Sequence, residues 1–215
     1  MRLSRLSSIS ASQGKAFFHP DEAALLRAFI ADIRKSYPDV LTGLNALDFD
    51  CKCLWERCAW HGILFSLERS KNLESVYLSG EGRSSATALV PGRQVLDALR
   101  LVRSGPKEQG VHFADYTLET ASQVLLGKGK LLTHEGSERI APVYPGSPRF
   151  GVYGYQEAVL VLHILKQTGL FRLTVESACL TGVTLDKTWT SVASFERLYG
   201  VERLKRGIAV PQAAY

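Results

Sequence analysis

A short acidic segment that follows a predicted strand is the part of this chain best suited to chemistry. The segment is Asn45-Ala-Leu-Asp-Phe-Asp50. Residues 40–44 are mainly apolar and lead into this turn, which predicts a short buried strand. A helix is predicted from Phe49 to His61, with Asp50 in its first turn. A carboxylate at such a junction can point into a cleft as a metal ligand, or it can cap its own helix, and the segment alone leaves both roles open.

The cysteines are a second candidate for metal binding. Cys51, Cys53 and Cys58 fall within eight residues and are followed by His61, whereas Cys179 is remote in sequence. Gaps of one and four residues between them do not match the two-residue gaps of zinc ribbons and knuckles. On a helix, Cys51 and Cys58 share a face and Cys53 points elsewhere. We therefore interpret them as small hydrophobic residues with reduced thiols, as expected of a cytoplasmic protein.

The charge of the chain favours an anionic partner. The formal net charge is +5 and the isoelectric point is near 9.1. Lys128 and Lys130 follow Gly127, a predicted left-handed cap at a helix C-terminus, where lysines also suit the helix dipole. These lysines can contact a phosphate backbone, and binding of that kind is weak and salt-sensitive. A solvated basic surface is the alternative interpretation.

The elements that must position these residues are mostly helices. An amphipathic helix is predicted to begin at Asp21, just after Pro20. The other predicted elements are a possible strand at 76–78, a strand and short helix at 94–101, helices at 117–126, 156–170 and 191–206, and a loop at 133–150. The helix at 156–170 is apolar almost all round, so we expect it to be buried. Residues 1–20 are predicted to be a disordered lead and residues 21–215 one domain, without a run of eighteen apolar residues that would span a membrane.

The order of several segments resembles the exonuclease domain of family B DNA polymerases, especially the bacterial DNA polymerase II branch. The segments that carry the resemblance are Tyr37–Asn45 with Phe49-Asp50, Gly92–Asp97, Tyr116–Lys130, Gly182–Asp186, Ser191–Phe195, Leu198-Tyr199 and Gly207–Pro211. The resemblance runs from about Asp21 to Pro211. Each motif is short, and it is their shared order that carries the resemblance.

The resemblance implies an α/β, ribonuclease H-like (DnaQ-like) 3′–5′ exonuclease fold that is helix-rich and incomplete. The family places an Asp-x-Glu motif on the first strand of the domain, and the residues before Asn45 contain no such motif. Asp21-Glu22 is adjacent rather than spaced by one residue, and it opens a helix. A sheet without its first strands has an uncovered edge, which predicts poor solubility or a homo-oligomer.

The resemblance also implies roles for individual residues. The third motif of the family, Tyr-x-x-x-Asp, is matched by Tyr153-Gly-Tyr-Gln-Glu157, with glutamate in place of aspartate. Asp50 and Glu157 would be ligands of Mg²⁺ or Mn²⁺, and Tyr153 would orient the attacking water. Asn45 and Phe49 would shape the site for a single-stranded DNA end. The longer Glu157 side chain displaces its carboxylate, which lowers the expected rate.

Three functions follow from this interpretation. The first, which we favour, is an exonuclease-domain homologue that binds nucleic acid, or a polymerase partner, and is impaired in catalysis. The second is an active Mg²⁺-dependent 3′–5′ DNA exonuclease of the proofreading type, in replication or repair, whose missing carboxylates come from a partner chain. The third is a truncated product without a function. The acidic motifs of a polymerase palm are absent, so we expect no polymerase activity, and we expect no membrane partner.

Overall fold

A computed structural model describes residues 6–9, 14–69, 76–78, 86–108, 110–127 and 148–208 of the chain. The first elements are β1 (Leu6–Ile9), β2 (Gly14–Ala16), α1 (Glu22–Ser36), β3 (Val40–Gly43), the π-helical turn η1 (Ala46–Asp50) and α2 (Cys51–Trp60). The middle elements are β4 (Val76–Leu78), β5 (Thr87–Leu89), β6 (Gln94–Asp97), α3 (Ala98–Glu108) and α4 (Leu118–Leu126). The last are α6 (Pro148–Gln167), α7 (Leu170–Thr181), the short 3₁₀ helix η3 (Leu185–Lys187) and α8 (Ser191–Lys205).

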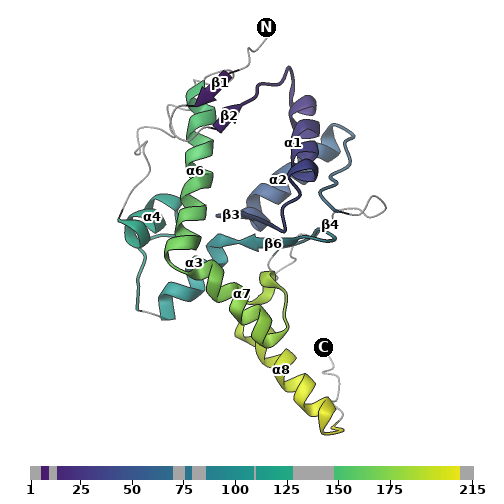
Figure 1. The fold of residues 1–215 in the computed structure, drawn as a ribbon, viewed down its shortest axis with the longest axis vertical. Coiled ribbons are helices and arrows are strands. Elements are labelled where there is room, and N and C mark those ends of the chain that lie inside the picture. Colours follow the sequence, from purple (N-terminus) through teal and green to yellow (C-terminus); the bar gives the residue numbers. More distant parts are fainter. Residues whose placement is uncertain are drawn as a thin grey trace.

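The strands form pairs, and the parallel pair lies at the centre of the molecule (Figure 1). β3 runs parallel to β6, with Val40 opposite Gln94 and Gly43 opposite Asp97. β1 pairs antiparallel with β2, and β4 pairs antiparallel with β5. Because parallel strands end at the same edge of a sheet, the turn after β3 and the start of α3 after β6 lie together.

Strand β6 separates two clusters of buried side chains. Val95 belongs to the cluster under α1 and α2, and the next residue, Leu96, belongs to the cluster formed with α3, α4, α6 and α7. Successive side chains of a strand point to opposite faces, so each face of β6 is covered by a different set of helices. The arrangement ties β3 and η1 to α6, which crosses the sheet on one side (Figure 1).

Two predicted helix ends are confirmed, and the structure adds two caps that the sequence analysis does not name. Helix α1 begins next to Asp21, whose Oδ1 accepts a hydrogen bond from the Ala24 N–H at 2.7 Å. Gly127 ends α4 in the left-handed conformation with φ of 64°, as predicted, and Thr117 caps the start of that helix. These helix ends follow from short-range hydrogen bonding. The α/β, helix-rich character is likewise observed, whereas the ribonuclease H-like assignment stays a prediction.

The structure differs from the sequence-based prediction in four places. Two strands, β1 and β2, lie within residues 1–20, where the sequence predicts a disordered lead. Strand β5 and helix α7 are also not predicted. Helix α6 begins at Pro148, inside the predicted loop 133–150, and it is not buried all round, because Leu162 and His163 are exposed. A run of apolar residues indicates burial but not which face a neighbour covers.

Two features of the C-terminal part complete the description. Helix α8 extends away from the rest of the molecule (Figure 1), and none of its residues is buried. Within the described ranges, no single helix is long and apolar enough to cross a membrane, although α6 and α7 together meet the length and composition test across a bend of 59°.

Candidate functional site

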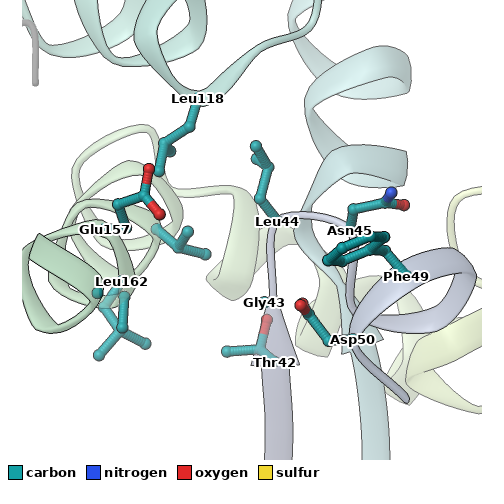
Figure 2. A pocket seen from close by; sticks show the side chains of 12 residues that line it. Thr42, Gly43, Leu44, Asn45, Phe49, Asp50, Leu118, Glu157 and Leu162 are labelled. Atoms are coloured by element: carbon teal, nitrogen blue, oxygen red, sulfur yellow. The ribbon is translucent and has the colours of Figure 1, made fainter. Parts of the chain in front are cut away.

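A pocket of about 560 Å³ lies between the end of β3 and helix α6 (Figure 2). Its lining residues are Thr42, Gly43, Leu44, Asn45, Phe49, Asp50, Leu118, Gly154, Glu157, Ala158, Val161 and Leu162. Four of the residues singled out in the sequence are among them: Asn45, Phe49, Asp50 and Glu157. The structure therefore brings together segments that are far apart in the chain.

The turn after β3 carries three of these side chains. Asn45 precedes the π-helical turn, and its carbonyl oxygen accepts the N–H groups of Phe49 and Asp50 at 3.1 and 3.3 Å. Single π-helical turns are frequent at functional sites. Asn45 makes no side-chain capping hydrogen bond, and Phe49 is 64% exposed. Both residues line the pocket, and they lie on the same side of it as Asp50, across from Glu157 (Figure 2).

Asp50 is a pocket residue and not a helix cap. Its side chain makes no capping hydrogen bond with α2, and the role of metal ligand stays a prediction. Partial burial raises the pKa of the Asp50 carboxyl, and the negative charges of Asp97 and Glu157 raise it further. A nearby cation would offset the causes that raise this pKa.

Glu157 reaches the pocket from α6. Its Oε1 accepts a hydrogen bond of 2.6 Å from the hydroxyl of Tyr153, one helical turn earlier. Tyr153 itself does not line the pocket. The remaining predicted contacts, Lys128 and Lys130, lie outside the described residues. The individual roles of these residues remain predictions.

Sequence reasoning does not include Asp97 and Leu118 among the site residues. Leu118 begins α4 and contributes an apolar side chain to the pocket. Asp97 ends β6 beside Gly43 and is buried, which raises the pKa of its carboxyl against the lowering effect of its hydrogen bonds. A carboxylate at the end of a predicted strand could have marked Asp97 as a candidate site residue. The pairing of that strand with β3 joins residues far apart in the chain, so local sequence patterns do not predict it.

The carboxylates of this pocket do not form a complete metal centre by themselves. Within the part of the chain that the structure describes, no group of three or more His, Cys, Asp or Glu side chains is placed to hold a metal ion. Asp50 and Glu157 supply two carboxylates to the pocket, and two is fewer than the four that the resemblance to the family implies for a two-metal site.

The cysteines do not add to this pocket. Cys58 is buried in the core, whereas Cys53 is exposed. Partial burial, together with the negative charges of Asp50 and Asp97, raises the pKa of the Cys51 thiol to about 11. This thiol is therefore protonated at neutral pH, and the thiolate is the form that binds metals.

A match to a protein-family model identifies the family of this chain. The model for the exonuclease domain of family B DNA polymerases matches residues 4–120, which is more than half of the chain. The chain belongs to the family B DNA polymerase exonuclease-domain family. The match begins at residue 4, earlier than the resemblance noted from about Asp21, and it includes β1, β2 and the turn that carries Asp50.

Individual family B polymerases are similar to this chain over most of its length. DNA polymerase II of Escherichia coli (strain K12) is 26% identical over 180 residues, which are 81% of this chain and 22% of that protein. A DNA polymerase of Thermococcus aggregans is 27% identical over 165 residues, 75% of this chain and 8% of the relative. The DNA polymerase catalytic subunit of Alcelaphine herpesvirus 1 (strain C500) is 28% identical over 164 residues, 71% and 15% respectively. The chain thus spans about a fifth or less of the length of these relatives.

Proposed function

We propose that this chain binds the 3′ end of single-stranded DNA in the pocket between β3 and α6 and cleaves it poorly or not at all by itself. The observation that carries the proposal is the meeting of Asn45, Phe49 and Asp50 with Glu157 in one pocket of a family B exonuclease domain. The same pocket lacks a third metal-binding side chain among the described residues.

The side chains of the turn suit a nucleotide. Phe49 offers an exposed ring on which a base can stack, an interaction worth about 1–3 kcal/mol per base. The amide of Asn45 can both donate and accept hydrogen bonds to a base or sugar. The net charge of +5 attracts the phosphate backbone in general, and Lys128 and Lys130 are the expected contributors near the end of α4.

Two features limit catalysis. Asp50 and Glu157 offer two carboxylates where the family motifs supply four, so a pair of divalent cations would be held with less negative charge. Glutamate at position 157 is one methylene longer than the aspartate of the family motif. A displacement of about 1 Å in a catalytic group can cost on the order of a hundredfold in rate. If Mg²⁺ or Mn²⁺ binds, these two residues hold it, and it would supply the charge that stabilises a leaving oxygen.

The test is a binding and cleavage assay on 5′-labelled single-stranded DNA with Mg²⁺ or Mn²⁺. We expect salt-sensitive binding that prefers a free 3′ end, without shortening of the oligonucleotide. Phe49→Ala should weaken binding about tenfold, as expected for loss of one stacked base. The matched control is Trp60→Ala, which removes an exposed ring on α2 outside the pocket. Cleavage from the 3′ end that Asp50→Ala abolishes would overturn the proposal.

A second candidate function is a nuclease completed by another chain. It is favoured by the free edge of β3, because among the described strands β3 pairs only with β6. The hydroxyl of Thr42 on this strand is buried without a hydrogen-bond partner, beside the pocket. An added strand can pair with such an edge, and one that carries Asp-x-Glu would bring two further carboxylates toward Asp50.

The two candidates are separated by adding a second chain that bears an Asp-x-Glu strand. Mg²⁺-dependent 3′ cleavage that requires both chains and is lost with Asp50→Ala would support completion. Cleavage by the added chain alone, or none by the mixture, would contradict it. A chain that neither binds nor cleaves under any of these conditions would match the third possibility, a product without a function.

A further inference from the structure

We propose that Asp97 is a positioning residue. Its carboxylate accepts a hydrogen bond from the Asn45–Asp50 turn, so that the Asn45 side chain is available to single-stranded DNA. The inference rests on the proposed DNA-binding function for its consequence, though not for its geometry. It assigns a role to a buried carboxylate that does not itself line the pocket.

The turn needs an external hydrogen-bond acceptor. The first N–H groups of a helix have no partner inside it, and the side chain that precedes the helix usually accepts one of them. Asn45 stands at that position and is a residue type well suited to capping, yet it makes no capping hydrogen bond. The Leu47 N–H is bound instead by Oδ2 of Asp97, at 3.0 Å. The Asp97 side chain, from β6, thus accepts the hydrogen bond that the Asn45 side chain would accept if it capped the turn.

Asp97 is held in place by the helix that follows it. Its Oδ1 accepts the N–H groups of Leu99 at 2.9 Å and Arg100 at 3.4 Å, at the start of α3. The side chain is buried, with a residue exposure of 3%. One carboxylate therefore joins the beginnings of two helical segments, and each oxygen serves a different one.

Two further links connect the same junction to the turn. The Leu99 N–H donates to the Leu44 carbonyl oxygen at 2.7 Å, next to Asn45. Arg100 Nη2 donates to Asp48 Oδ2 at 3.3 Å and to the Ala86 carbonyl oxygen at 2.7 Å. The guanidinium of Arg100 also lies over the ring of Trp189, 5.4 Å from its centroid. The turn is consequently fixed to the β6–α3 junction at Leu44, Leu47 and Asp48.

Which side chain accepts the Leu47 N–H should affect DNA binding. If Asp97 no longer accepts the Leu47 N–H, the Asn45 side chain can accept it, because Asn45 is at the capping position. Asn45 would then turn from the pocket toward its own backbone. Loss of Asp97 should therefore weaken DNA binding through Asn45, beyond any loss of stability.

Asp97→Asn tests this link selectively. An amide has only one oxygen, and two donors, Leu99 and Arg100, converge on the Oδ1 position. The oxygen is expected to stay there, which places the amide NH₂ against the Leu47 N–H and breaks that hydrogen bond alone. Thr174→Ala is the stability control, because Thr174 is equally buried, donates to the Leu170 carbonyl oxygen at 2.8 Å, and lies on α7 outside the pocket.

The experiment combines amide hydrogen exchange with affinity for a single-stranded oligonucleotide. In Asp97→Asn, exchange at Leu47 should rise while exchange at Leu99 stays slow, and affinity should fall about fivefold, the scale of one lost neutral hydrogen bond between Asn45 and the DNA. Thr174→Ala should leave affinity unchanged. Asn45→Ala should weaken binding in the natural chain but add little in the Asp97→Asn background, because both changes remove the same contact.

Additive effects of Asp97→Asn and Asn45→Ala, or unchanged exchange at Leu47, would overturn the inference. If the natural chain does not bind the oligonucleotide, the proposed function fails, whereas the exchange comparison of Leu47 with Leu99 still decides the role of Asp97. If Asp97→Asn does not fold, exchange in the natural chain decides, because a Leu47 N–H bonded to Asp97 Oδ2 should exchange as slowly as the Leu99 N–H bonded to Oδ1. Exchange at Leu47 as fast as at an exposed amide would overturn the inference.

Discussion

Gly43 and Asp50 lie so close together that a Cβ atom at Gly43 would stand 3.0 Å from Oδ2 of Asp50. Real Cβ atoms rarely make contacts this short, so a larger residue at position 43 would require the Asp50 carboxylate to shift by a few tenths of an ångström. Since Gly43 does not have a positive φ, its requirement is space and not backbone conformation.

Gly43→Ala is therefore expected to turn the Asp50 carboxylate away from the strand end. We expect a several-fold loss of affinity for single-stranded DNA with little change in unfolding free energy, because Asp50 is solvent-accessible and can move. Gly151→Ala on α6 is the control, since nothing lies within 4 Å of its added methyl. That control should raise helix stability by about 0.5–1 kcal/mol. Equal affinities of the two variants would contradict the prediction.

Glu157→Gln should lower the pKa of Asp50. The negative charge of Glu157 is one of the causes that raise it, after desolvation and the charge of Asp97. Titration of the Asp50 carboxyl carbon by nuclear magnetic resonance measures the shift directly. Glu176→Gln, on the exposed surface of α7, should leave the Asp50 titration where it is. An unchanged Asp50 titration in Glu157→Gln would show that the two groups do not interact.

Glu22 should contribute a pH-dependent part of the stability. Hydrogen bonds from Arg57 and His61 lower the pKa of the Glu22 carboxyl to about 2, and these bonds join α1 to α2. A carboxyl with a lowered folded-state pKa stabilises the fold above its unfolded pKa, near 4.5, and this stability is lost as pH falls toward 2. In urea unfolding between pH 6 and 2, Glu22→Gln should remove this part of the acid sensitivity. The same pH dependence in both proteins would refute the assignment.

The exposed apolar side chains of α8 should cause self-association. They are Val192, Phe195, Leu198, Tyr199, Val201 and Leu204, and none of them is buried against the rest of the molecule. Phe195 stacks on Tyr199 with ring centroids 5.2 Å apart, and the other side chains are distributed around the helix. We expect sedimentation velocity to show oligomers or aggregates that Phe195→Asp with Leu204→Ser reduces. A monodisperse monomer of the natural chain would contradict this expectation.

Short-range information in the chain was enough for the helix ends and for the family motifs. Asp21, Thr117 and Gly127 act on backbone groups within a few residues, so their roles can be predicted without knowing the fold. The same holds for the strand that leads to Asp50, because a short apolar run followed by turn residues is a local pattern. The order of such motifs then indicated the family that the family model identifies.

The site itself depends on long-range packing. Asp50 and Glu157 line the same pocket because β3 pairs with β6 and α6 packs over these two strands. A local sequence pattern predicts neither which strands pair nor which face of a helix is covered. The exposed face of α6 was missed for this reason. So was Asp97, whose carboxylate accepts the Leu47 N–H across fifty residues of chain. The residue types and their local geometry were determined by the sequence, whereas their mutual positions were decided only when strands and helices packed into one structure.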